Sequence, residues 1–304
     1  MAKKSSKPRW STERRLEFIE FRLFWEGRIN RSDLVDFFGI SVPQASADLT
    51  NYQEAAEGNL VYDKTAKAYV ASGKFKPVFF IPSADRYLAE LRLLYAKLLT
   101  EDETWVSRPP THAIVPTLRR RLEPKILRSL LDAIRTCSSI EVNYQSMSRP
   151  DPTWRRIAPH ALAFDGFRWH ARAWCYTREA FVDFVIGRVL GARSPKPDEI
   201  DPKNDVGWNR EVTLKIGPHP KLKDGSRRAT ELDYGMVDGI LKVTIKACLV
   251  QYFTLRFGLD RDSEKLPPTK QQIVFLNRDE IEPILKSAGV TLDMPSTEPA
   301  RKQK

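Results

Sequence analysis

Hydrophobic residues recur at helical spacing through the first sixty residues of the chain and then give way to short β-rich runs. "STERRLEFIEFRLFWEG" predicts a helix that Gly27 ends, and "NRSDLVDFFGI" predicts a shorter one that Gly39 ends. "SVPQASADLTNYQEAA" predicts a third helix with Ser41 as its N-cap. The runs 60–62 and 68–70 flank a polar turn and predict a hairpin.

Three helices, a tight turn and a hairpin are typical of a winged helix-turn-helix. The helix after the turn then presents its N-terminal side chains to the major groove, with Ala47 (or Val42), Leu49 and Tyr52 facing inward. A helical bundle that binds protein is the alternative. Short polar side chains of the third helix and two lysines at the tip of the wing are the candidate DNA contacts: Ser41, Gln44, Ser46, Asn51, Lys64 and Lys67.

A helical stretch follows, and after it the pattern changes to that of a sheet. The segment 81–136 predicts amphipathic helices that connect two domains. "SIEVNYQSM", "RRIAPHALAF", "FRWHARAWC" and "FVDFVIGRVLGA" predict strands, the middle two joined at Asp165-Gly166 by a two-residue turn. Four or five short strands with tight turns favour a small barrel or a strongly bent sheet.

The last third mixes strands and helices. "SPKPDEIDPKNDVG" has the composition of a linker. "EVTLKIGP", "GILKVTIKA" and "QQIVFL" predict strands, whereas "CLVQYFTLRFG" and "RDEIEPILKSAG" predict helices, the latter despite Pro283. We therefore expect a multidomain α+β chain. Its expected parts are a winged helix (1–80), a helical connector (81–136), a β-barrel (137–196), a small α+β domain (205–292) and a disordered tail (293–304).

Alternation along the predicted hairpin separates two faces. With a two-residue turn, Phe164 lies opposite Phe167 and Leu162 opposite Trp169. One face is then apolar and includes Trp169. The other carries cations and rings, namely Arg155, Arg168, His170, Arg172, Trp174 and Tyr176. Arginines pair with phosphates and rings stack on bases. A solvated face whose arginine stems merely cover rings is the alternative.

Charge favours an anionic partner. The net charge is +11 and the isoelectric point about 9.5. Residues 118–195 hold 14 basic side chains, 13 of them arginine, against 7 acidic ones, so this stretch alone carries +7. Arginine suits bidentate phosphate recognition better than lysine does.

Motifs for other classes of protein are missing from the sequence. Cys137, Cys175 and Cys248 are far apart, no histidine lies in an HExxH pattern, and there is no Gly-rich phosphate loop. His170 and Cys175 alternate onto opposite faces, so they do not form a catalytic pair. We therefore expect no enzymatic activity, no metal and no cofactor. No apolar run is long enough for a bilayer and no secretory signal is present, so we expect a cytoplasmic protein without a membrane partner.

Two stretches resemble a known family. "YQSMSRPDPTWRRIAPHALAFDGFRWHARAWC" and "FVIGRV" are similar to the WYL domain, a small Sm-like β-barrel of bacterial transcription regulators. The name-giving triplet reads Trp169-His170-Ala171, so only the tryptophan is kept. The similarity is closest to winged-helix–WYL regulators associated with phage-defence operons, whose DNA-reading helix resembles "ISVPQASADL". It covers nearly the whole chain.

This resemblance implies a basic pocket that binds nucleic acid or nucleotide-like effectors. Carried over residue by residue, it assigns to the pocket Tyr144, Ser146, Ser148, Arg155, His170 and Arg188, to which the alternation argument adds Arg168 and Arg172. The change of tyrosine to His170 leaves the identity of the ligand open.

The resemblance also implies dimerisation through the C-terminal extension. We thus expect a homodimeric, ligand-responsive repressor of a phage-defence operon that grips an inverted repeat of double-stranded DNA. The alternative is an RNA- or single-stranded-DNA-binding protein, or an adaptor whose helix-turn-helix contacts protein.

Overall fold

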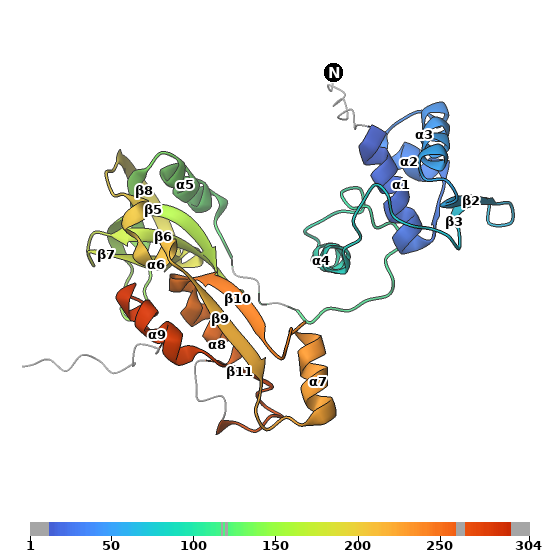
Figure 1. Ribbon diagram of the computed structural model, residues 1–304. Helices are drawn as coiled ribbons and strands as arrows, with labels where there is room; N and C mark the ends of the chain where they lie inside the picture. Colours follow the sequence, from blue (N-terminus) through green and yellow to red (C-terminus); the bar gives the residue numbers. More distant parts are fainter. Residues whose placement is uncertain (1–11, 117, 119–120, 260–264, 293–304) are drawn as a thin grey trace, which may run out of the picture. The chain divides into compact units, whose positions relative to one another are not determined.

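The chain divides into two units, residues 1–117 and 118–304. The computed structural model describes residues 12–116, 118, 121–259 and 265–292 (Figure 1). The predicted tail, 293–304, lies outside these residues. Among the described helices, none combines the length and the hydropathy that crossing a bilayer requires.

The first unit begins with the expected helices and hairpin. Its elements are α1 (Thr12–Glu26), α2 (Arg31–Phe38), α3 (Val42–Ala55), β1 (Arg28–Ile29), β2 (Leu60–Asp63) and β3 (Ala68–Ala71). Gly39 ends α2 in the left-handed region at φ 66°. The Ser41 hydroxyl accepts a hydrogen bond from the Gln44 backbone N–H at 3.3 Å, which caps α3. The short strand β1, which the hydrophobic pattern did not predict, pairs with β3 and gives the sheet order β1-β3-β2.

Aromatic rings fill the core of this unit. The ring of Phe18 meets those of Phe38 and Trp105 edge to face, with centroids 5.1 and 5.7 Å apart. Helix α4 (Ala84–Tyr95) packs against the same core through Leu91, which is 6% exposed. The predicted connector is therefore shared between the units, because its other helix, α5 (Pro124–Arg135), packs on the sheet of the second unit.

An antiparallel five-stranded sheet forms the first part of the second unit (Figure 1). Its strands, β4 (Ser138–Tyr144), β5 (Thr153–Phe164), β6 (Trp169–Cys175), β7 (Ala180–Val185) and β8 (Val189–Pro197), run in the order β7-β6-β5-β4-β8. The 3-10 turn η1 (Ile186–Arg188) separates β7 from β8, so the single strand predicted over this stretch is two strands. Val142, Ile157, Ala173 and Leu130 of α5 are buried in its core.

The β5–β6 register differs from the predicted one. Phe164 pairs with Trp169 and Leu162 with Ala171, because the connecting loop has four residues, 165–168, instead of two. A bulge between Pro159 and Ala161 adds a residue to β5, so the strand before it exchanges faces. The prediction of one shared basic face was therefore wrong, since Arg155 lies before the bulge.

The second unit ends in a small α+β fold. Strands β9 (Glu211–Pro218), β10 (Leu241–Lys246) and β11 (Ile273–Phe275) form a sheet in the order β10-β9-β11, with helices α7 (Asp224–Asp233), α8 (Val250–Phe257) and α9 (Arg278–Ser287). Pro283 lies inside α9, as the pattern predicted. The predicted linker, 194–207, is partly structured, since it includes the end of β8, the 3-10 turn η2 (Pro202–Asn204) and the start of α6 (Val206–Asn209). A third 3-10 turn, η3 (Ala247–Leu249), precedes α8.

Candidate functional sites

The third helix of the first unit exposes part of the predicted DNA-contact set. Gln44 and Asn51 are exposed, whereas Ser46 is half-buried and its hydroxyl donates to the Val42 carbonyl at 3.0 Å. Two residues predicted to face inward, Ala47 and Val42, are exposed, and Ala45 is buried instead. Gln44, Ala47 and Asn51 consequently share the outer face of α3.

A buried ion pair fixes that helix on α1. Asp48, fully buried, accepts from the Arg15 guanidinium at 2.6 and 3.0 Å. The side-chain amide of Gln44 donates to Asp48 at 3.1 Å. This contact orients Gln44 at the surface, which lowers the entropy that it loses when it meets a ligand.

Two lysines stand at the wing. The Asp63 carboxylate accepts from the N–H groups of Thr65 and Ala66 at 2.8 and 3.0 Å and shapes the turn. Lys64 and Lys67 are both exposed there, Lys67 with φ 47°. Sequence reasoning missed a further cation, Arg31 at the start of α2, which donates to the Tyr69 hydroxyl on β3 at 3.3 Å. Only the pairing of β1 with β3 brings it near the wing.

A cavity of about 210 Å³ opens at one end of the five-stranded sheet of the second unit. It brings together five of the eight predicted ligand contacts, and it adds Arg178 and Asp183, which sequence reasoning missed. Its lining consists of Tyr144, Ser146, Met147, Ser148, Arg155, Arg178, Val182, Asp183, Phe184 and Arg188.

Cations dominate this cavity. Arg155 is only 9% exposed, and its one side-chain hydrogen bond goes from Nε to the Thr153 hydroxyl at 3.3 Å. Its guanidinium carbon lies 5.5 Å from the centre of the Tyr144 ring. Over the described ranges of the chain, neither Arg155 nor Arg178 nor Arg188 makes an ion pair. A buried guanidinium without a counter-charge is costly, so it attracts an anion.

The remaining walls supply rings and hydroxyls. Tyr144 and Phe184 meet edge to face with centroids 5.0 Å apart, and the Tyr144 hydroxyl accepts from the Val185 N–H at 3.3 Å. The Ser146 and Ser148 hydroxyls lie 3.3 Å apart. Three guanidiniums, two hydroxyls and a ring edge suit a phosphate that is attached to a flat or sugar-like group.

The other three predicted ligand contacts do not line the cavity. Arg168 and His170 both bind Asp165, through Nε at 2.8 Å and Nε2 at 2.9 Å. Burial alone raises the pKa of Asp165, but hydrogen bonds from His170 and from the N–H groups of Phe167 and Arg168 outweigh it and lower the pKa to about 2. Asp165 therefore fixes the hairpin loop. His170 is 2% exposed, so its predicted place on an open surface was wrong.

Arg172 is buried as well, and it is fully paired. Asp205 of the predicted linker accepts from it at 2.7 and 2.9 Å, and His160 Nε2 lies 2.9 Å from the same carboxylate. Burial opposes the charges, yet these bonds raise the pKa of Arg172 and lower that of Asp205. Arg172 was expected to face a ligand, but Asp205 and Asp183 hold it in an ion-pair network instead.

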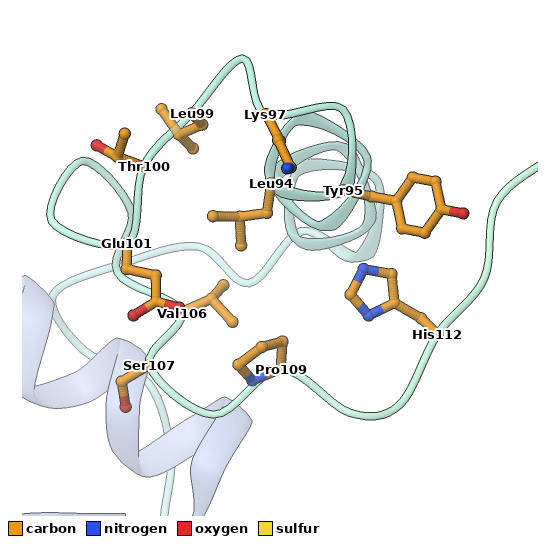
Figure 2. A pocket seen from close by; sticks show the side chains of 10 residues that line it. All are labelled: Leu94, Tyr95, Lys97, Leu99, Thr100, Glu101, Val106, Ser107, Pro109 and His112. Atoms are coloured by element: carbon orange, nitrogen blue, oxygen red, sulfur yellow. The ribbon is translucent and has the colours of Figure 1, made fainter. Parts of the chain in front are cut away.

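A larger cavity, of about 460 Å³, lies in the first unit between the end of α4 and residues 99–112 (Figure 2). Leu94, Val106 and Pro109 point into it, and the His112 ring lies 5.9 Å from that of Tyr95. Its walls are largely apolar, and it contains none of the predicted contacts. It is therefore a weaker candidate for an anion than the arginine-lined cavity.

Two of the three cysteines are buried, and Cys137 is exposed. Cys175 and Cys248 are buried, and burial raises the pKa of Cys248 to about 12, which keeps the thiol protonated. A search of the described residues for three or more His, Cys, Asp or Glu placed to hold a metal ion finds no such group.

Three parts of the chain match models of known protein families. Residues 11–93 match a family described as the BrxR transcriptional regulator winged helix-turn-helix domain, residues 125–194 match the WYL domain, and residues 211–281 match the BrxR transcriptional regulator C-terminal dimerization domain.

Full-length relatives are similar over most of the chain. The DNA-binding transcriptional repressor CapW of Stenotrophomonas maltophilia is 44% identical over 91% of this chain and 93% of its own length. CapW of Pseudomonas aeruginosa is 41% identical over the same shares. Among solved structures, proteasome accessory factor B/C of Arthrobacter aurescens is 15% identical, with a TM-score of 0.26, and the match covers 94% of this chain and 49% of that one.

Proposed function

Because the chain belongs to the family of CapW DNA-binding transcriptional repressors, we propose that it represses transcription as a homodimer on an inverted repeat and that an anion in the WYL cavity modulates it. The operon that it controls is proposed to be a phage-defence operon, which rests on the family resemblance alone.

The outer face of α3 supports the DNA-binding part. Gln44 and Asn51 are exposed amides two helical turns apart on the same face of α3, and amides form paired hydrogen bonds with adenine edges. Lys64 and Lys67 on the wing add sequence-independent contacts to phosphates. The C-terminal dimerisation domain supplies the twofold symmetry that matches two half-sites.

One observation carries the effector part. Arg155 is buried, makes no ion pair with any residue that the structure describes, and lines a cavity that also holds Arg178 and Arg188. The cavity, at about 210 Å³, is below the usual size for a whole drug-like ligand. We therefore propose that it takes one phosphate-bearing unit of a nucleotide or of a single-stranded nucleic acid.

A binding assay tests the repressor. The full chain is titrated onto fluorescent duplexes from the promoter region of its own operon and onto a shuffled duplex. We expect one discrete complex at an inverted repeat with at least about 1000-fold preference over the shuffled duplex. Equal affinity for any duplex would exclude the regulator and favour a general nucleic-acid binder.

A second assay tests the effector. A 5′-phosphorylated oligothymidylate is titrated onto the wild-type chain and onto Arg155→Ala, with Arg128→Ala on α5, which does not line the cavity, as the matched control. We expect the Arg155 variant to lose at least about tenfold in affinity, because a charged hydrogen bond is lost. Equal affinity of the wild type and both variants would remove the cavity from the proposal.

A further inference from the structure

Asp183 of β7 belongs to two groups of residues at once. It lines the WYL cavity together with Arg155, Arg178 and Arg188. Its carboxylate also accepts from the Tyr252 hydroxyl at 2.9 Å and lies 3.4 Å from the nearest guanidinium nitrogen of Arg172. The Asp183 side chain is 9% exposed, so both groups act on it with little screening by water.

Tyr252 reaches Asp183 from the C-terminal domain. It lies on α8, and its ring packs against the ring of His170 with centroids 4.9 Å apart. Burial and the Asp183 charge raise the pKa of Tyr252, so the hydroxyl keeps its proton and donates it to the hydrogen bond. The ring of Tyr252 thus packs on His170, and its hydroxyl donates a hydrogen bond to Asp183.

Arg172 extends the same contact to α6. Asp205, which binds Arg172 at two positions, also caps α6 by accepting from the Trp208 N–H at 3.1 Å. A Cβ on Gly207 would lie 3.3 Å from both Arg172 and Cys248, so α6 is closely packed on the barrel and on η3. We call His170, Arg172, Asp183, Asp205 and Tyr252 the junction.

We propose that Asp183 transmits occupancy of the WYL cavity to the C-terminal dimerisation domain through the junction. The proposal rests on the proposed function in taking an anion as the occupant. With the cavity empty, the guanidiniums of Arg155, Arg178 and Arg188, which form no ion pair among the described residues, attract the Asp183 carboxylate away from the junction. A bound anion neutralises them and repels Asp183, which strengthens its contacts with Arg172 and Tyr252.

Asp183 is therefore a positioning residue that two sets of charges compete for. The 3.4 Å separation from Arg172 is at the long end for a charged hydrogen bond, which leaves room for the contact to shorten. Couplings of this kind change an equilibrium by about 5- to 150-fold.

The test uses neither DNA nor effector, so it can fail or succeed independently of the proposed function. Ser148→Asp places a carboxylate in the cavity wall of the full chain. Amide hydrogen exchange of α8 is then measured by mass spectrometry. We expect exchange in residues 250–257 to slow by at least about fivefold. Ser129→Asp on α5, outside the cavity, is the matched control and should leave this exchange unchanged.

Combining Ser148→Asp with one of two further substitutions distinguishes an effect transmitted through Asp183 from a local change in packing. Tyr252→Phe removes one hydroxyl, and Asp183→Asn keeps an acceptor for Tyr252 but removes the charge. In each, Ser148→Asp should change α8 exchange by less than twofold. The proposal is overturned if Ser148→Asp slows exchange equally in all three backgrounds, or if it has no effect in the wild-type chain.

Discussion

Two arginines of the WYL domain are equally buried but differ in their partners. Arg172 is 8% exposed and bound by Asp205 at 2.7 and 2.9 Å, whereas Arg155 is 9% exposed and makes no ion pair within the described part of the chain. We therefore predict a much larger loss of stability for Arg172→Ala than for Arg155→Ala, although both remove the same side chain from a similarly buried environment.

Arg172→Ala should destabilise the second unit strongly. It leaves Asp205, 1% exposed, as a buried carboxylate whose remaining partners among the described residues are His160 and the Trp208 N–H. Removing one partner of a buried pair typically costs about 3–5 kcal/mol. Arg155→Ala loses a 3.3 Å hydrogen bond worth about 1 kcal/mol but also removes a buried charge that lacks a counter-charge, so its net effect should stay within about 1 kcal/mol.

Urea denaturation followed by tryptophan fluorescence measures the difference. Trp154, Trp169, Trp174 and Trp208 report on the second unit. With a slope of about 2–3 kcal/mol per molar urea, the midpoint of that unit should fall by at least about 1 M for Arg172→Ala and by less than about 0.5 M for Arg155→Ala. Equal shifts, or a larger shift for Arg155→Ala, would refute the assignment of a structural role to Arg172 and a binding role to Arg155.

Buried contacts of Glu20 and Asp165 and the exposed lysines of the wing each give a further testable prediction. The buried Glu20 carboxylate accepts from the N–H groups of Val78, Phe79 and Phe80 at 2.8, 2.6 and 3.0 Å. Glu20→Gln should destabilise the first unit by about 3 kcal/mol in thermal unfolding, because the new NH₂ group would face backbone N–H donors instead of accepting from them. Folding lowers the pKa of Asp165 from 3.8 to about 2. The ionised Asp165 carboxylate therefore contributes its full stabilisation of the folded state above pH about 4, and this contribution is lost as the pH falls through 2. The stability gap between wild type and Asp165→Asn should therefore shrink by about 2 kcal/mol between pH 4.5 and 2, and a constant gap would contradict this. Replacing Lys64 and Lys67 with Gln should reduce the salt dependence of DNA binding by about one phosphate contact each, as anisotropy at several salt concentrations would show, while the preference for the operator stays unchanged.

The fold followed closely from local patterns. Gly27 and Gly39 marked the ends of α1 and α2, and the Ser41 cap marked the start of α3. The alternating runs placed the wing and β4, β5 and β6, because these signals act within a few residues. The features predicted wrongly are the length of the β5–β6 loop and the register of β5. Both depend on the number of residues in a segment, which residue preferences do not reveal. The hairpin loop is two residues longer than Asp165-Gly166 alone suggests, because the Asp165 side chain accepts from Phe167 and Arg168 and stabilises the longer loop.

The arginine-lined cavity contains only some of the predicted ligand contacts, and no local pattern in the sequence predicts which ones. The polar run 144–148, Arg155 and Arg188 gather at one end of the sheet, as the family resemblance implied. Arg178 and Asp183 join them only because β7 lies at the edge of that sheet. A period-two pattern does not reveal the bulge at Pro159 and Ala161 that moves Arg155 to this side.

The sequence by itself determined the order of the domains, the type of each element and the excess of arginine that favours an anionic partner. These features depend on side-chain chemistry and short-range spacing. The tertiary structure decided which arginines are available. Asp205 lies thirty-three residues from Arg172 along the chain and Tyr252 sixty-nine from Asp183, and only folding brings these charges into contact. Pairing in three dimensions neutralises Arg172, whereas Arg155 makes no ion pair with the residues that the structure describes. The same residue type therefore stabilises the fold at one position and is proposed to bind an anion at the other.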